Sequence, residues 1–217
     1  MLLLALALLL AYLIGSLSGS LLLGRRSGVD IRTLGSGNAG GTNAFRTRGW
    51  KFALGVIAID IGKGALAGWI GIAMHADAAP FSALAQGLAC VFAAVIGHTW
   101  PLYFGFRGGK GAGTLVGGLL VMWPGSVLPV FALWLGVLIA TGYVGLATIC
   151  AVWLLIPLAW WSGAQASSDP RLLFALVAAA FIGFTHRANI SRLLKRTEYR
   201  FERARVWKRW FGRGRDA

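Results

Sequence analysis

Residue types suited to phosphate binding are concentrated in one glycine-rich segment, residues 35–46, which reads GSGNAGGTNAFR. Glycines let the backbone approach a ligand closely, and their N–H groups can bind phosphate oxygens. Arg46 can add a bidentate guanidinium contact. The other candidate ligands are Ser36, Gly37, Asn38, Thr42 and Asn43. Close helix packing would explain the glycines alone, so the accompanying polar residues predict an anion site.

A second segment of this kind, residues 97–114, reads GHTWPLYFGFRGGKGAGT. A Gly-Gly-Lys-Gly turn that enters a helix offers free N–H groups and the positive end of the helix dipole. The candidates here are His98, Gly108, Gly109, Lys110, Gly111 and Thr114. The Walker spacing is absent because Gly111 follows Lys110, so nucleotide hydrolysis is not expected.

A third segment, residues 186–194, reads HRANISRLL. In a helix, His186 and Asn189 would share one face, and Arg187 would point about 100° away. All three are candidates for phosphate contacts. Three separate segments with phosphate-binding chemistry exceed what one phosphate needs, so we expect two phosphate-bearing substrates.

Two further ionisable residues, Asp60 and Lys63, lie within an apolar run. Charges inside a membrane span are costly unless they are paired, and a spacing of three residues places both on one helical face. We interpret them as a structural ion pair, with a contribution of Lys63 to phosphate binding as the alternative. No histidines, cysteines or carboxylates recur at metal-ligand spacing, so we expect neither a metal nor a cofactor.

The elements that must position these residues are membrane helices. The chain is 57% hydrophobic and 13% charged, with a mean hydropathy of +0.70, whereas soluble domains carry about 25% charge. We therefore expect an all-α polytopic membrane protein with about seven spans, or five if the longest apolar stretch is miscounted. The expected spans are residues 2–23, 52–74, 81–96 and 172–184, and three short helices in 112–161, separated at 123–126 and 141–143.

The net charge of +14 is unevenly distributed along the chain. Basic residues gather in 24–51 and 187–217, whereas 75–80 has none. The positive-inside rule then predicts that both basic segments and 98–111 are cytoplasmic, and that the N-terminus is outside. The basic, aromatic residues 199–217 are expected to form an amphipathic tail on the anionic inner leaflet. Nucleic acid is not an expected partner, because no RNA-recognition motif accompanies the charge.

The three segments, in this order, resemble the motifs of the acyl-phosphate:glycerol-3-phosphate acyltransferases (PlsY type), and the resemblance covers nearly the whole chain. It implies a single integral-membrane acyltransferase domain, residues 1–198, in the bacterial cytoplasmic (inner) membrane, with the active site facing the cytoplasm. Departures from the family pattern are Gly41, Trp100, Arg107 and Gly113, and Ser18 stands where the first span often has proline. Arg196 replaces a usual glycine, which leaves open both the turn before Glu198 and a role for that carboxylate.

The resemblance implies transfer of a fatty acyl group from acyl phosphate to the 1-hydroxyl of glycerol 3-phosphate, in phospholipid biosynthesis. The partners it implies are these two substrates, membrane lipids and an upstream enzyme that forms acyl phosphate. Its implied catalytic residues are Ser36, Arg46, Lys110, His186 and Asn189. The proton acceptor stays open between His186, His98 and a substrate phosphate oxygen. We favour the phosphate, because nearby Arg and Lys make histidine an uncertain base.

Other functional classes fit the sequence less well. A phosphate or organophosphate transporter is the alternative, but it would show polar residues at the membrane midplane and an internal repeat of broken helices. The polar segments instead gather at one predicted face. The nucleophile-elbow pattern G-x-S-x-G is absent, so an acyl-enzyme is not expected. Acyl-chain preference, oligomeric state and a different acyl donor in the same fold are not determined by the sequence.

Overall fold

The computed structural model describes residues 1–163 and 169–204, and these are helical or irregular with no strand. The α-helices are α1 (Leu2–Gly15), α2 (Gly19–Arg26), α3 (Gly41–Ala73), α4 (Ala83–Thr99), α5 (Ala112–Met122), α6 (Pro124–Thr141), α7 (Val144–Trp153), α8 (Leu155–Trp161), α9 (Arg171–Thr185) and α10 (Arg187–Leu194). Three short 3₁₀ helices are η1 (Ile31–Thr33), η2 (Leu102–Phe104) and η3 (Glu202–Ala204). The expectation of an all-α protein is confirmed for the described residues.

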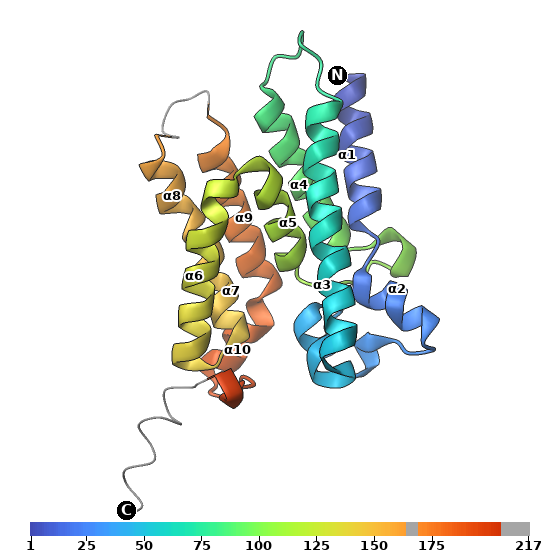
Figure 1. Ribbon diagram of the computed structural model, residues 1–217, viewed down its shortest axis with the longest axis vertical. Coiled ribbons are helices and arrows are strands. Elements are labelled where there is room, and N and C mark those ends of the chain that lie inside the picture. Colours follow the sequence, from blue (N-terminus) through green and yellow to red (C-terminus); the bar gives the residue numbers. More distant parts are fainter. Residues whose placement is uncertain (164–168, 205–217) are drawn as a thin grey trace, which may run out of the picture.

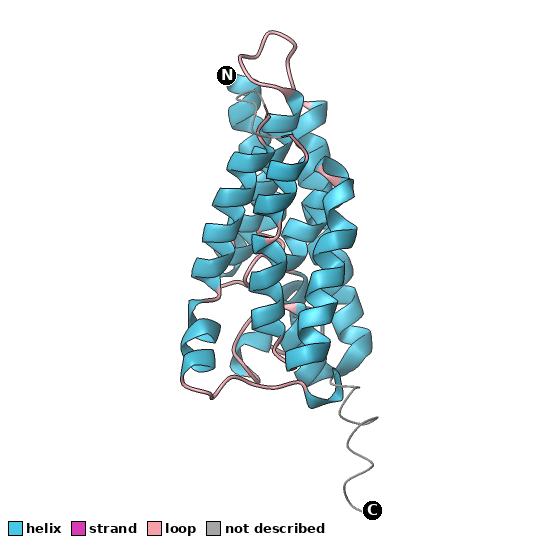
Figure 2. Cartoon of the chain, turned by 90° about the vertical axis from the view of Figure 1, so that its left-hand side faces the viewer, coloured by secondary structure: helices cyan, strands magenta, loops and turns pink. Residues whose placement is uncertain are grey.

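The helices form a bundle whose members run mostly along the long axis of the molecule (Figure 2). Helices α1, α3 and α4 pack together on one side, and α6, α7, α8 and α9 on the other, with α5 against α3 and α4 between the two groups (Figure 1). The N-terminus lies at one end of the bundle, and α2 and α10 lie at the other. The chain thus returns its second and last helices to the same end.

In the part of the chain that the structure describes, four helices are long and apolar enough to cross a membrane, or up to six if each bent helix pair counts as one span. The bent pairs are α1 with α2, at 47°, and α9 with α10, at 61°. The count of seven is reached only if the short apolar α5 is added. The predicted breaks in residues 112–161 occur where expected, since α5 ends at Met122 and α6 at Thr141.

Helix α5 is short, and this places the loop before it inside the bundle. An 11-residue helix covers about 16 Å, roughly half of the hydrocarbon thickness of a membrane. Figure 1 shows the lower end of α5 well above α10. Helices α3 and α5 touch through glycines: a Cβ on Gly64 or on Gly117 would lie 1.9 Å from a carbonyl oxygen of the opposite helix.

Helix α3 consists of two parts joined at Gly49, whose φ of 80° and ψ of 179° are not helical. Only glycine adopts such a conformation readily. Residues 41–48 therefore form a separate helix at the end of the bundle, and they carry Arg46. The longer part of α3 crosses the bundle and carries Asp60 and Lys63.

Candidate active site

The first glycine-rich segment is held in shape by Asn43. Its side-chain oxygen accepts a hydrogen bond from the Ser36 N–H at 2.9 Å, and its nitrogen donates to the carbonyls of Ile31 and Leu34. Asn43 is buried, with 1% of its surface exposed. Because both amide donors are occupied, Asn43 supports the loop, whereas Ser36 and Thr42 are exposed and available for a ligand.

Arg32 joins this loop to the second segment. Its guanidinium donates to the carbonyls of Phe104 and Arg107 at 2.8 and 2.9 Å and forms an ion pair with Asp30 at 2.7 Å. The hydrogen bonds from Arg32 hold the pKa of Asp30 below its ordinary value. Asp30 and Arg32 fit the family pattern in the sequence, but this link between the two loops was not predicted, because both residues lie before the first glycine-rich segment.

The second loop packs so closely that a side chain at Gly109 would not fit. A Cβ there would lie 2.1 Å from Nε2 of His98 and 2.9 Å from the carbonyl oxygen of Ala39 in the first loop. His98 is buried, with 3% exposed. The structure therefore places His98 behind the loop as a support, and Gly109 where the first and second segments meet.

His98 also belongs to a buried polar network with Asp60 and Lys63. Lys63 Nζ lies 3.0 Å from Asp60 Oδ1 and 2.8 Å from His98 Nδ1. At the break between α1 and α2, Leu17 accepts a hydrogen bond from Lys63, and Gly19 N–H donates to Asp60. The ion pair expected from the sequence is thus present, and it connects three helices to the glycine loop through His98.

Lys110 connects the second segment to the third. Its ammonium donates to Oδ1 of Asn189, and its carbonyl accepts a hydrogen bond from Thr185 at 3.0 Å. Burial, together with the positive charges of Arg192 and Arg46, lowers the pKa of Lys110 to about 8. The lowered pKa means that the protein supplies too little negative charge to stabilise the Lys110 ammonium fully. A bound anion would supply that charge.

Glu198 lies inside this cluster. Its carboxylate accepts hydrogen bonds at 2.6 Å from Asn189 Nδ2 and from Arg192 Nε. The turn before it forms despite the non-glycine residue: Arg196 adopts a φ of 58°, and Thr197 N–H bonds to the Arg192 carbonyl at 2.8 Å. The turn that the sequence left open therefore forms, and it brings the Glu198 carboxylate into contact with Asn189 and Arg192.

Arg46 reaches the same cluster from the helical segment 41–48. Its guanidinium carbon lies 3.8 Å from the centre of the Tyr199 ring, and its Nε is buried with no hydrogen-bond partner among the described residues. Arg46, Lys110 and Arg192 supply three positive charges against one carboxylate, an excess of two. This excess matches the charge of about −2 that a phosphate monoester carries near neutral pH.

His186 closes the cluster at the junction of α9 and α10. Its Nδ1 lies 2.9 Å from the carbonyl oxygen of Ile182. A carbonyl oxygen can only accept, so Nδ1 carries the proton and Nε2 of the neutral ring is an acceptor. The side chain is 5% exposed, and its environment includes the charges of Lys110 and Glu198.

The remaining predicted site residues differ in their exposure and in their contacts. Arg187 is exposed and stacks on Phe184 at 4.3 Å, so no contact directs it at Lys110. Thr114 is fully buried, and its hydroxyl lacks a hydrogen-bond partner among the residues described. Gly37 is exposed, Asn38 and Gly108 are partly buried, and Gly111 begins α5 with a φ of 88°. Arg192 and Tyr199 were not predicted from the sequence. Arg192 could have been, because it lies three residues after Asn189 and so shares a helix face with it.

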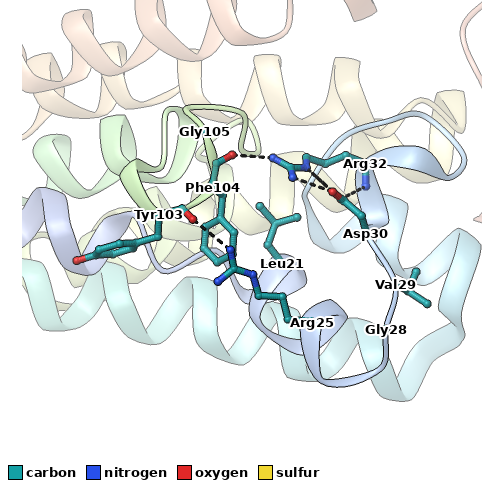
Figure 3. Close-up of a pocket in the computed structure, with 9 residues that line it drawn as sticks. All are labelled: Leu21, Arg25, Gly28, Val29, Asp30, Arg32, Tyr103, Phe104 and Gly105. Carbon is teal, nitrogen blue, oxygen red and sulfur yellow. Dashed lines mark hydrogen bonds and ion pairs between the residues drawn. The ribbon is translucent and has the colours of Figure 1, made fainter.

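A pocket of about 500 Å³ lies outside this cluster, between α2, η1 and η2. Figure 3 shows Arg25 directed at the Tyr103 carbonyl and Arg32 directed at Asp30 and at the Phe104 carbonyl. Both arginines donate hydrogen bonds to the protein itself, and none of the residues that line the pocket is a predicted site residue. The cluster, and not this pocket, is therefore the candidate active site. In residues 1–163 and 169–204, His, Cys, Asp and Glu form no group that could hold a metal ion.

Comparison with known proteins shows which family this chain resembles. The family model described as glycerol-3-phosphate acyltransferase matches residues 5–196. Proteins named glycerol-3-phosphate acyltransferase from Chlorobaculum parvum and Azotobacter vinelandii are 38% and 41% identical, each over 88% of this chain, and the alignments cover 93% and 96% of those proteins.

Solved structures agree with the sequence relatives. The crystal structure of PlsY (YgiH), an integral membrane glycerol 3-phosphate acyltransferase, in its glycerol 3-phosphate form has a TM-score of 0.82 at 32% identity, covering 91% of this chain and 95% of the other. Its lysophosphatidic acid form has a TM-score of 0.79 and covers 91% and 94%. The recessed cationic cluster and these matches lead to one conclusion: the chain belongs to the glycerol-3-phosphate acyltransferase family, as an integral-membrane member of PlsY type.

Proposed function

We propose that this protein transfers a fatty acyl group from acyl phosphate to the 1-hydroxyl of glycerol 3-phosphate, giving 1-acylglycerol 3-phosphate and inorganic phosphate. The supporting observation is the convergence of Arg46, Lys110 and Arg192 around a single carboxylate. The two related PlsY crystal structures are described as a glycerol 3-phosphate form and a lysophosphatidic acid form. The acyl donor is our inference from the motifs.

In this mechanism the cationic cluster holds two anionic substrates together. The hydroxyl oxygen attacks the acyl carbonyl carbon, the new C–O ester bond forms, and the C–O bond to phosphate breaks. Phosphate leaves with the bonding electron pair and needs no strong acid. Placing both substrates in contact and neutralising their repulsion supplies most of the acceleration, and Lys110, Arg46 and Ser36 are suited to that role.

The hydroxyl proton needs an acceptor, and the hydrogen bonds of the two histidines support His186 over His98. In the neutral ring of His186, Nδ1 carries the proton and donates to the Ile182 carbonyl, so Nε2 is free to accept a proton. His98 Nδ1 is occupied by Lys63, and its ring is buried behind Gly109. We propose that His186 Nε2 takes the proton. The substrate phosphate oxygen that the sequence favoured is the alternative.

We also propose that the site faces the cytoplasm of a bacterium, with the N-terminus outside and the chain crossing the inner membrane about seven times. The basic segments 24–51 and 187–204 lie with α2 and α10 at the end opposite the N-terminus (Figure 1), which supports this orientation by the positive-inside rule. The proposed catalytic domain is residues 1–198, and most of the basic tail 199–217 lies outside the described residues. An upstream enzyme that forms acyl phosphate would then deliver it from the cytoplasmic side.

The test is acyl transfer to radiolabelled glycerol 3-phosphate by the purified protein, with palmitoyl phosphate and palmitoyl coenzyme A offered separately. Transfer from palmitoyl phosphate alone is expected, and Lys110→Ala and Arg46→Ala are expected to abolish it. Arg48→Ala is the matched control, because Arg48 is exposed and two residues from Arg46. Transfer from coenzyme A alone would overturn the donor, and binding of glycerol 3-phosphate without any transfer would favour the transporter.

A further inference from the structure

Arg46 is held differently from the other cations of the cluster. Lys110 donates to Asn189, and Arg192 donates to Glu198, so both spend hydrogen bonds on the protein. Among the described residues, none accepts a hydrogen bond from Arg46 Nε, although this nitrogen is buried. A buried donor without a partner costs about 1–3 kcal/mol, so its persistence indicates a function.

The contact that does hold Arg46 is with the face of an aromatic ring. Its guanidinium carbon lies 3.8 Å from the centre of the Tyr199 ring. A cation over a ring is bound through its flat face, and the five N–H donors of arginine lie in the plane of the guanidinium. The contact with the ring therefore holds Arg46 without using its Nε–H donor, which stays available to an anion.

We propose that Tyr199 is a positioning residue that holds the Arg46 guanidinium ready for a substrate phosphate. The inference rests on the proposed function and deepens it, because it assigns Arg46 as the cation reserved for the ligand. From the sequence, Tyr199 was expected to belong to the amphipathic tail 199–217, because the third motif ends before it. Lys110 and Arg192 then set the charge around the phosphate, and Arg46 binds it in a bidentate manner.

The position of the Tyr199 ring is itself fixed from both sides. On one side, Glu198 is anchored by Asn189 and Arg192. On the other side, the Phe201 N–H donates to the Gly142 carbonyl at 2.8 Å, and the Phe201 ring packs edge-on against Phe45 at 5.9 Å. The segment 198–201 thus lies across the helix that carries Arg46, and it brings the ring to the guanidinium.

The test compares Tyr199→Leu, Tyr199→Phe and Phe201→Leu in the full-length protein. A cation over an aromatic ring contributes an amount that corresponds to a change in binding of roughly 3- to 30-fold. Tyr199→Leu is expected to raise KM for one of the two phosphate-bearing substrates about tenfold with kcat within about twofold, because Arg46 can clamp only one phosphate. Tyr199→Phe keeps the aromatic ring and is therefore expected to have the same KM as the wild type.

Phe201→Leu is the matched control, because it removes the ring packing against Phe45 but keeps the backbone hydrogen bond to Gly142 and the Tyr199 ring. Its increase in KM is therefore expected to be clearly smaller than that of Tyr199→Leu. Equal increases in KM for Phe201→Leu and Tyr199→Leu, or an unchanged KM in Tyr199→Leu, would overturn the inference. A binding assay separates it from the proposed function: inorganic phosphate is expected to raise the Tm of wild type and of Tyr199→Phe, and to raise that of Tyr199→Leu much less. A loss of this difference overturns the inference even if transfer is observed. Retention of the difference supports it even if the acyl donor proves to be another.

Discussion

Asn189 donates a hydrogen bond from its side-chain nitrogen to the Glu198 carboxylate at 2.6 Å. This bond fixes which end of the amide faces which partner, because a carboxylate accepts only from the nitrogen. The amide oxygen is thereby directed at the ammonium of Lys110. Glu198 thus acts on the phosphate site through Asn189, and it balances part of the positive charge.

Replacing Glu198 with Gln is expected to weaken both the orientation of Asn189 and the charge balance of the cluster. The neutral amide cannot pair with Arg192, and its own donors compete with the Asn189 nitrogen. We expect a loss of about 1–3 kcal/mol in the free energy of unfolding, seen as a lower Tm in detergent, and a fall in kcat/KM of at least about tenfold. Glu202→Gln is the control, because Glu202 is an exposed partner of Arg200 and such surface pairs contribute little. An unchanged Tm and kcat/KM in Glu198→Gln would contradict this role.

The pH dependence of activity should report Lys110. Its pKa is lowered from 10.5 to about 8, mainly by burial, so the free enzyme loses this charge as the pH rises through about 8. We expect kcat/KM for transfer to fall above that pH. In Lys110→Arg the descending limb should move to higher pH or disappear, because arginine stays charged. A limb that stays at about pH 8 in this variant would assign the titration to another group.

The stability of the unliganded protein should change in the opposite direction over the same range. Between about pH 8 and 10.5 the unfolded state binds a proton at Lys110 that the folded state has lost, so the free energy of unfolding rises with pH. Thermal melts of wild type and Lys110→Met across this range measure the effect. The increase attributable to Lys110 should be absent in the methionine variant.

A second catalytic prediction concerns the proton acceptor. His186→Gln removes the basic Nε2 while keeping a polar side chain near the same position. We expect kcat to fall about 100-fold or more, as is typical for the loss of a general base, with a smaller change in KM. His75→Gln is the control, because His75 contacts Gln86 and Phe81 away from the cluster. A kcat within a few-fold of wild type would instead support transfer of the proton to a substrate phosphate oxygen.

Some contacts in this protein can be predicted from the sequence, and others depend on the tertiary structure. Asp60 and Lys63 could be paired because three-residue spacing in a helix fixes their relative position. The three phosphate-binding segments could be assigned to one membrane face from the charge pattern. The inclusion of His98 in the buried pair, and of Arg32 as the link between loops, depends on tertiary contacts between distant segments. The break of the first expected span at residues 16–18 was not foreseen, although the glycines and serines of residues 15–20, GSLSGS, coincide with it.

Arg196 offers a prediction about stability alone. It adopts a φ of 58° after the end of α10, where a side chain costs about 1–2 kcal/mol and glycine costs little. Arg196→Gly is expected to raise the free energy of unfolding by about 1 kcal/mol without lowering kcat/KM, since Arg196 is exposed. Thermal melts and transfer assays check both parts. Arg196→Ala is the control, because it removes the same charge but keeps a Cβ and should give no comparable gain.

The buried network of Asp60, Lys63 and His98 should separate stability from activity. Asp60→Asn leaves the Lys63 ammonium buried without its carboxylate, and breaking such a pair costs about 3–5 kcal/mol. The double variant Asp60→Leu with Lys63→Met removes both charges and is expected to regain most of the lost Tm. Its activity should stay low, because His98 loses the partners that hold its ring against Gly109 in the phosphate loop. Full recovery of kcat/KM in the double variant would show that the network serves folding only.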